Sequence, residues 1–163
     1  MKTLLIMRPA KSSWAEPGLQ DFDRPLNDRG RRDAPRMGTW LKDQGLTPDV
    51  IISSTANRAK TTAEIVAEHS DYDRNIRFHE HLYHGAPRDY FRSTGPLSTT
   101  LQCCLLVGHN PGLEQLVENL TDCYETMPTA AVAVVECPIE DWALLEVERP
   151  FKLRDVWRPK EIF

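Results

Sequence analysis

The sequence predicts an α/β fold, a three-layer sandwich in which a mostly parallel central sheet carries helices on both faces. Short apolar runs alternate along the chain with segments whose apolar residues repeat at helical spacing. Several of these runs are almost continuously apolar, which is typical of strands buried on both faces of a parallel sheet. Alternation of strands and helices favours the three-layer arrangement. The length of 163 residues fits a single domain, 1–163, at roughly 150 residues per domain.

Six apolar runs are expected to form the strands. They are residues 2–7, 48–53, 75–78, 101–107, 130–136 and 142–148.

Three helices are expected between these strands. Asn27 can cap the first, which continues to about Gln44 and stops at Gly45. The second helix follows Asn57, and the third follows Pro111 with apolar residues repeating at i, i+3, i+4 and i+7. The remaining chain is expected to be irregular at 11–26 and 84–100 and to form a strap over the sheet at 149–163.

The charge balance argues against a general nucleic-acid binder. Twenty Lys and Arg residues against 24 Asp and Glu residues give a net charge of −4, whereas such a binder needs a basic field. A membrane location is not expected either, because no apolar stretch is long enough to cross a bilayer. The short apolar start runs directly into Arg8, which does not fit a signal peptide and favours a cytoplasmic protein.

The cysteines and clustered histidines do not have the spacing of a metal or disulfide site. The four cysteines contain no CxxC pair, so reduced thiols acting as small apolar groups are expected. His79, His81 and His84 lack a matching set of Cys or carboxylate ligands. The sequence therefore predicts no metal site.

Candidate chemistry gathers where the predicted strands end. Ligands of open α/β sheets bind beyond the carboxyl ends of the strands. Arg8 follows the first strand, Arg58 lies shortly after the second, and His109 and Asn110 follow the fourth. The planar guanidinium group of arginine and the free N–H groups of a helix N-terminus are donors that match phosphate oxygens. His109 can donate a further hydrogen bond. Taken singly, a residue such as Arg8 is more often a surface ion-pair partner, and one such as His109 is more often a structural histidine. Their shared position at the strand ends favours a phosphate site.

Several motifs together resemble those of the histidine phosphatase, or phosphoglycerate mutase-like, superfamily, and most of all its SixA-type phosphohistidine phosphatase branch. The motifs are LLIMR-x-AKSSW, DRPLNDRGRRDAPRMG, SSTANRAKTTAEIV, LLVGHNPGLEQLV and RPKEIF, and they span nearly the whole chain. The resemblance implies the same α/β fold, with Arg8, Arg58 and His109 holding the transferring phosphoryl group. It also implies a histidine nucleophile in an Arg-His-Gly or Arg-His-Ala signature and no cofactor.

Position 9 departs from that pattern, because this chain has Arg8-Pro9-Ala10 where the family has its nucleophilic histidine. Proline cannot form a phosphohistidine. Loss of a covalent nucleophile costs roughly 10⁶-fold in rate in one well-studied hydrolase of another family, which is about 8 kcal/mol of transition-state stabilisation. The expected outcome is a phosphatase homologue that keeps its phosphate pocket and has little or no activity.

Other residues are alternatives for the chemistry. Ser12 and Ser13 are close enough in sequence to act as unconventional nucleophiles, although neither has an evident general base. Glu80 loosely matches an E-x-x-Y setting in which larger family members use a glutamate as the acid, and it can equally be an exposed surface residue. The expected partner is a phosphorylated small molecule or a phosphoprotein, such as a phosphohistidine domain; an active phosphatase and a non-catalytic scaffold remain alternative hypotheses.

Overall fold

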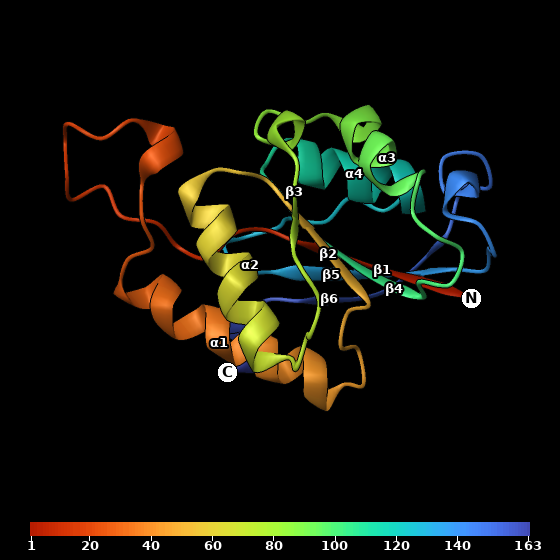
Figure 1. Ribbon diagram of the computed structural model, residues 1–163, viewed down its shortest axis with the longest axis horizontal. Helices are drawn as coiled ribbons and strands as arrows, with labels where there is room; N and C mark the ends of the chain where they lie inside the picture. Colours follow the sequence, from red (N-terminus) through yellow and green to blue (C-terminus); the bar gives the residue numbers. More distant parts are fainter.

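The computed structural model describes residues 1–163 and contains one six-stranded sheet with the order β3-β2-β4-β1-β5-β6 (Figure 1). The strands are β1 Lys2–Met7, β2 Val50–Ser53, β3 Arg77–Phe78, β4 Cys103–Val107, β5 Val132–Cys137 and β6 Lys152–Trp157. The α-helices are α1 Asp28–Asp43, α2 Asn57–His69, α3 Pro87–Thr94, α4 Gly112–Thr121 and α5 Pro159–Ile162. Short 3-10 turns lie at η1 Asp21–Asp23, η2 Glu80–Leu82 and η3 Trp142–Leu144.

The predicted mostly parallel sheet is confirmed. Strands β3, β2, β4 and β1 pair in parallel, while β5 runs antiparallel between β1 and β6. Five of the six strands therefore point in the same direction. Parallel strands buried by helices on both faces explain why their sequences are continuously apolar.

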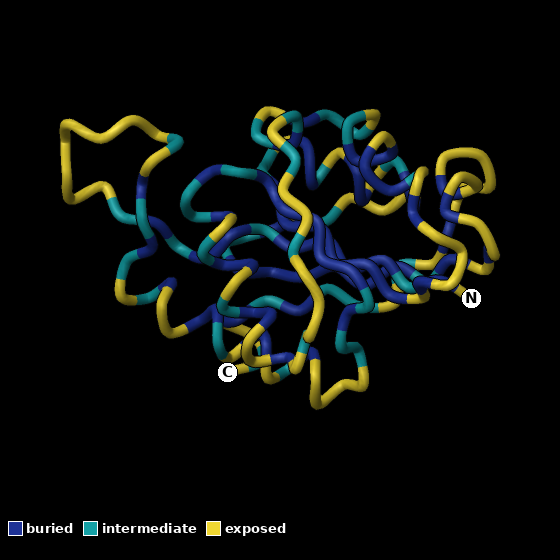
Figure 2. Tube along the Cα trace, in the orientation of Figure 1, coloured by how far each residue is buried: buried dark blue, intermediate teal, exposed yellow.

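Helices cover both faces of the sheet, as expected (Figure 1). Alternate residues of β1 show this directly, since Leu4 and Ile6 pack in the core beneath α3 and α4. Leu5 and Met7 belong instead to the core beneath α1 and α2. The buried strands form the centre of the molecule, and the exposed segments lie around them (Figure 2).

The first helix begins and ends where its sequence predicts. The side chain of Asn27 accepts a hydrogen bond of 2.9 Å from the amide of Gly30, which satisfies one of the free N–H groups of the first turn. Asp43 is the last helical residue, and Gly45 follows with φ of 73°, a conformation that glycine adopts without steric cost.

The predicted strand at 142–148 is wrong, and the last strand lies in the tail instead. Asp141 accepts a hydrogen bond from the amide of Ala143 and starts a 3-10 turn, in which Trp142 is buried and donates to the Leu101 carbonyl at 2.9 Å. The run is apolar because one aromatic ring anchors it, not because it pairs with the sheet. Within the predicted strap, β6 pairs with β5 as an edge strand.

Two further expectations need correction. Segment 84–100 is not irregular throughout, because α3 occupies its middle. Pro87 stands in the first turn, and the Asp89 carboxylate accepts from the Ala86 amide at 2.9 Å, so two standard start signals are present. The predicted strand 75–78 is reduced to the two exposed residues of β3. None of the helices combines the length and the apolar character needed to cross a membrane.

Gly30 allows the first turn of α1 to lie directly against the loop that follows β1. A Cβ atom at Gly30 would stand 2.2 Å from the Lys11 carbonyl oxygen, which is backbone and cannot rotate away. We expect Gly30→Ala to lower the free energy of unfolding by about 1–3 kcal/mol through overpacking, measured by urea denaturation. Gly18→Ala is the matched control, because nothing lies within 4 Å of a Cβ there. Equal stability of the two variants would contradict the close packing.

Candidate functional site

Three neighbouring strands end at the same level of the sheet. Met7 of β1 and Ser53 of β2 both pair with Val107 of β4. The parallel pairing continues one residue beyond the strands. The Ser54 amide donates to the Val107 carbonyl at 2.9 Å, and the Gly108 amide donates to the Met7 carbonyl at 3.1 Å. The residues that follow the three strands are therefore brought together at one edge.

A pocket of about 180 Å³ opens at this edge. The sequence analysis assigned six residues to the site, and all of them except Glu80 line this pocket: Arg8, Pro9, Arg58, His109 and Asn110. Five further residues complete the lining, namely Lys11, Ser12, Trp14, Arg24 and Thr129. Four of the ten lining side chains are cationic and none is acidic.

Arg8 is half-buried and forms no ion pair. Its Nη1 atom donates to the Met127 carbonyl at 3.2 Å, which orients the guanidinium and leaves its other donors available. Burial lowers the pKa of Arg8, and Arg58 acts in the same direction, while Glu114 opposes both. Arginine stays protonated in proteins even when its pKa is lowered. Arg8 is therefore a partly desolvated cation without a carboxylate partner, and such a group favours an anionic ligand.

Arg58 lies in the first turn of α2 and is held by the loop before α1. It donates to the Asp21 backbone carbonyl at 2.8 Å through Nη1 and to Asp21 Oδ2 at 3.1 Å through Nη2. The Tyr83 hydroxyl donates to the same carboxylate, and Arg24 binds its other oxygen at 2.9 Å. The hydrogen bond from Tyr83, followed by those of the two arginines, lowers the pKa of Asp21 to about 2. Asp21 is therefore a carboxylate that occupies donors a phosphate would use.

His109 is held from two sides. Its Nε2 lies 2.9 Å from the Ser54 hydroxyl, and its backbone amide donates to the Tyr90 hydroxyl at 3.2 Å. Burial, reinforced by the charge of Arg58, lowers the pKa of His109 to about 4. The free protein thus has a neutral imidazole at pH 7, in a position where an incoming anion would favour the protonated form.

Asn110 ties the loop after β4 to the loop before β5. Its Nδ2 donates to Glu114 at 3.2 Å and to the Met127 carbonyl at 3.0 Å, while the Glu114 carboxylate accepts from the Met127 amide at 2.7 Å. The Asn110 Oδ1 atom is buried without a hydrogen-bond partner. Asn110 therefore fixes the wall that also positions Arg8, through the shared carbonyl of Met127.

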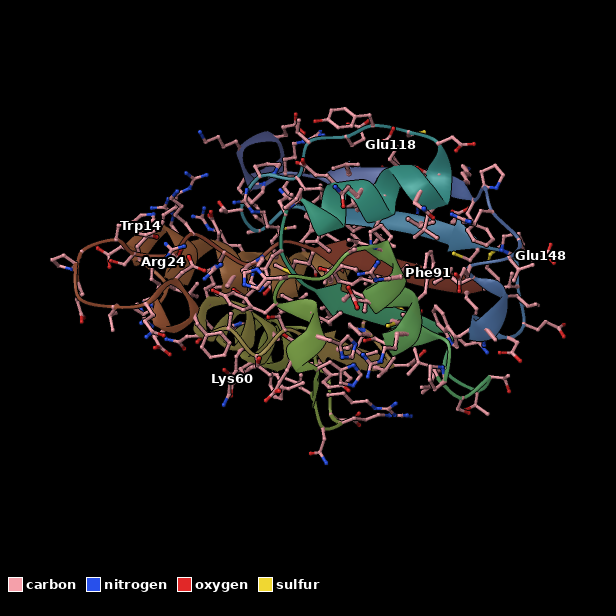
Figure 3. The ribbon with its side chains drawn as sticks, turned by 90° about the horizontal axis from the view of Figure 1, so that it is seen from above. Trp14, Arg24, Lys60, Phe91, Glu118 and Glu148 are labelled. Carbon is pink, nitrogen blue, oxygen red and sulfur yellow. The ribbon has the colours of Figure 1, made fainter.

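The loop over residues 11–26 borders the pocket, and its tip is exposed (Figure 2). It is closed at its base by the Ser12–Leu26 bridge. Arg24 lies under the ring of Trp14 at 3.5 Å and donates to the Ser12 hydroxyl at 2.6 Å, and Figure 3 shows Trp14 and Arg24 together at one end of the molecule. The Ser12 oxygen thus contacts a cation and has no carboxylate or imidazole base as a hydrogen-bond partner.

The structure does not bring Glu80 into the pocket. Glu80 is exposed at the start of η2, whereas Tyr83 of the same motif reaches Asp21 and lies edge-on to His109 with ring centroids 5.5 Å apart. The nearby His79 and His81 share the Ser93 hydroxyl, each at 2.8 Å, so these histidines are joined by a serine.

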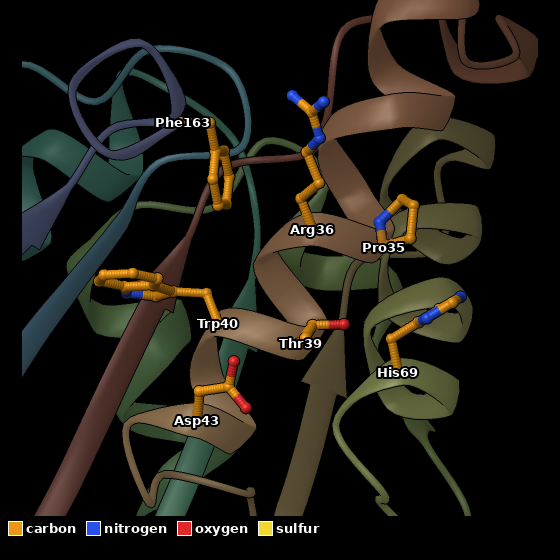
Figure 4. A pocket seen from close by; sticks show the side chains of 7 residues that line it. All are labelled: Pro35, Arg36, Thr39, Trp40, Asp43, His69 and Phe163. Carbon is orange, nitrogen blue, oxygen red and sulfur yellow. The ribbon is translucent and has the colours of Figure 1, made fainter.

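A larger cavity of about 610 Å³ lies on the outer side of α1, away from the strand ends (Figure 4). It contains none of the residues predicted for the site. Its lining comes from α1, the end of α2 and the C-terminal residue: Pro35, Arg36, Thr39, Trp40, Asp43, His69 and Phe163. The four cationic side chains and the absence of an acidic one in its lining identify the smaller pocket as the candidate site.

Comparisons with known proteins agree with this geometry. Residues 4–84 match the model of the histidine phosphatase superfamily, branch 1. Rv1276c of Mycobacterium tuberculosis, an uncharacterised protein, is 34% identical over 140 residues, which cover 79% of this chain and 85% of the relative. The chain belongs to the histidine phosphatase superfamily. A Streptomyces avermitilis 2,3-bisphosphoglycerate-dependent phosphoglycerate mutase is 39% identical to this family member over 70 residues, 42% of the chain and 28% of the mutase.

Solved structures of SixA proteins share the fold of this family member. The Agrobacterium tumefaciens structure assigned as phosphohistidine phosphatase SixA superposes with a TM-score of 0.78 at 28% identity, over 97% of this chain and 99% of the other. The protein histidine phosphatase SixA complexed with tungstate gives a TM-score of 0.85 at 21% identity, over 99% of each chain. The predicted α/β histidine phosphatase fold is thereby confirmed.

The depressed pKa of His109 predicts pH-dependent anion binding. Bound sulfate should raise the pKa of His109 above its free value of about 4, so binding takes up a proton. We expect sulfate affinity, measured by calorimetry, to increase by roughly three- to tenfold as the pH falls from about 7 to about 5, since one pKa unit corresponds to a factor of ten. Sulfate is a suitable probe because it stays a dianion over this range. His109→Gln should flatten the profile, and an unchanged profile would contradict the assignment.

The Asp21 carboxylate predicts that the free site is partly self-neutralised. Asp21→Asn should tighten sulfate binding by about three- to tenfold at low salt, because a competing charge leaves Arg58. Asp23→Asn in the same 3-10 turn is the control, since the Asp23 side chain forms no ion pair. Weaker sulfate binding by Asp21→Asn would show instead that Asp21 positions Arg58 for the ligand.

Proposed function

We propose that this chain, as one domain over residues 1–163, binds a phosphoryl group in the pocket at the strand ends and has little or no phosphatase activity. One observation carries the proposal: Arg8, Arg58 and His109 line the same pocket as Pro9. The ligand is a phosphorylated small molecule or a phosphoprotein, a phosphohistidine domain being one example. Three of the four cysteines are buried as free thiols, which suits the proposed cytoplasmic setting.

Recognition would use the charges that the fold already orients. The guanidinium groups of Arg8 and Arg58 supply planar pairs of donors that match phosphate oxygens, and they keep their charge. His109 would add a third hydrogen bond and gain a proton as the phosphate enters. Asp21 would leave Arg58 to make room for the oxygens. These steps need only the chain's own residues.

Hydrolysis would lack its first step. In the reaction that the family resemblance implies, a histidine at position 9 attacks phosphorus in line. Pro9 is buried, and its carbonyl accepts a hydrogen bond from the Ala130 amide at 3.1 Å. Its ring has no nucleophilic atom. Positioned cations alone stabilise charge in the transition state but do not replace a nucleophile. Ser12 is a poor substitute, because its oxygen is engaged by Arg24 and has no base beside it.

The decisive experiment restores the nucleophile. We expect Pro9→His to raise turnover of p-nitrophenyl phosphate at least about a hundredfold over the wild-type chain, as part of the roughly 10⁶-fold that a nucleophile provides. Pro9→Ala is the control, because it removes the proline ring without adding an imidazole. The gain should disappear in Pro9→His combined with His109→Ala.

Two results would contradict the proposal. Wild-type turnover comparable to that of active phosphatases would show that the chain has another nucleophile. A wild-type protein that shows no thermal shift with tungstate or vanadate would show that the pocket does not bind phosphoryl groups.

A folded Pro9→His variant that binds sulfate and stays inactive would show that more than the nucleophile has been lost.

A further inference from the structure

A second basic cavity lies beside the phosphate pocket. It has a volume of about 440 Å³ and shares Arg8, Lys11 and Thr129 with the first pocket. Its remaining cations come from elsewhere in the chain: Arg29 from the first turn of α1, and Arg158 and Lys160 from the C-terminal segment. The two cavities are therefore adjacent, and the Arg8 and Lys11 side chains line both of them.

The cations of the second cavity fall into two groups. Arg158 is paired with Glu125 at 2.8 Å and Glu161 at 3.3 Å, and Arg29 with Asp33 at 3.5 Å. In contrast, Arg8, Lys11 and Lys160 form no ion pair. Paired arginines hold the walls, and unpaired cations remain for a ligand. The Glu161 carboxylate lines the same cavity. Five cationic side chains against the carboxylates of Glu161, Asp33 and Glu125 therefore leave an excess of two positive charges at this concave surface, in a chain whose net charge is −4.

The wall between the two cavities is fixed by backbone contacts. Arg158 donates to the Thr126 carbonyl at 3.1–3.2 Å through Nε and Nη2, and Arg8 donates to the carbonyl of the next residue, Met127, at 3.2 Å. The segment before β5 therefore anchors one arginine from each cavity. Because the same segment binds both side chains, Arg8 and Arg158 are held in place relative to each other.

We propose that the second cavity binds a second anionic group of the same ligand, so that the ligand is a small phosphorylated molecule bearing another phosphate or a carboxylate. The inference rests on the proposed function, because the first phosphoryl group must occupy the pocket of Arg58 and His109. Lys160 then determines specificity without contacting that phosphoryl group, since it lines the second cavity and is absent from the lining of the phosphate pocket.

The test compares ligands with one and two anionic groups. Calorimetry on the wild-type chain would use ethylene, propylene and butylene bisphosphonates, the alkylphosphonate of the same length for each, and phosphonopropionate. We expect at least one bisphosphonate to bind about tenfold more tightly than its monophosphonate. Phosphonopropionate shows whether a carboxylate suffices in the second cavity.

Lys160→Gln locates the second group. It should weaken the preferred bisphosphonate by about fivefold, equivalent to about 1 kcal/mol, and leave the monophosphonate unchanged within about twofold. Lys152→Gln is the matched control, because Lys152 stands at the start of β6, at the opposite end of the parallel strands from the pocket, and should affect neither ligand.

The outcomes separate the two proposals. If monophosphonates bind but no bisphosphonate binds more tightly, or if Lys160→Gln weakens both ligands equally, the second-anion proposal is wrong and the phosphate pocket stands. A bisphosphonate preference that Lys160→Gln leaves intact also overturns the assignment to this cavity. If no ligand of the series binds, the proposed function fails together with this inference.

Discussion

The common end point of three parallel strands is the constraint on which the site depends. Because Met7, Ser53 and Val107 lie at one level of the sheet, the chain must leave β1, β2 and β4 at the same edge. Arg8 and His109 follow within two residues of their strands, so loop flexibility adds little uncertainty to their positions. Burial of the strands on both faces maintains the register, and the register places the charged groups.

Where apolar periodicity dominates, the fold follows from the sequence. The buried strands β1, β2, β4 and β5 and the cap at Asn27 were predictable, since each depends on local composition or on one side-chain hydrogen bond. The structure of the C-terminal part of the chain was not predictable. Residues 142–148 are as apolar as a strand, yet the burial of Trp142 against the Leu101 carbonyl decides their structure. This hydrogen bond joins residues 41 positions apart, so nothing in the sequence around Trp142 indicates it.

The site divides in the same way. Residues that directly follow strands were predictable, because the topology alone brings them to one edge. Asp21 and Arg24 were not, since they belong to a long loop whose path depends on contacts with Arg58, Tyr83 and Trp14. The same holds for Lys160, which reaches the cavity only because the tail forms an edge strand rather than a strap. The local excess of positive charge was predictable from the positions of Arg8 and Arg58 after their strands, although the net charge of −4 does not show it.

The loop over residues 11–26 makes Asp21 an intramolecular competitor for Arg58. A tethered group binds at an effective concentration set by the length and stiffness of its tether, in the millimolar range for short flexible chains. A free anion must displace this tethered carboxylate, so the apparent affinity of the pocket for the anion falls as the effective concentration of Asp21 rises. The exposed tip around Gly18, where a side chain would touch nothing, can therefore change in length or stiffness and reset the ligand threshold without altering any residue that contacts the ligand.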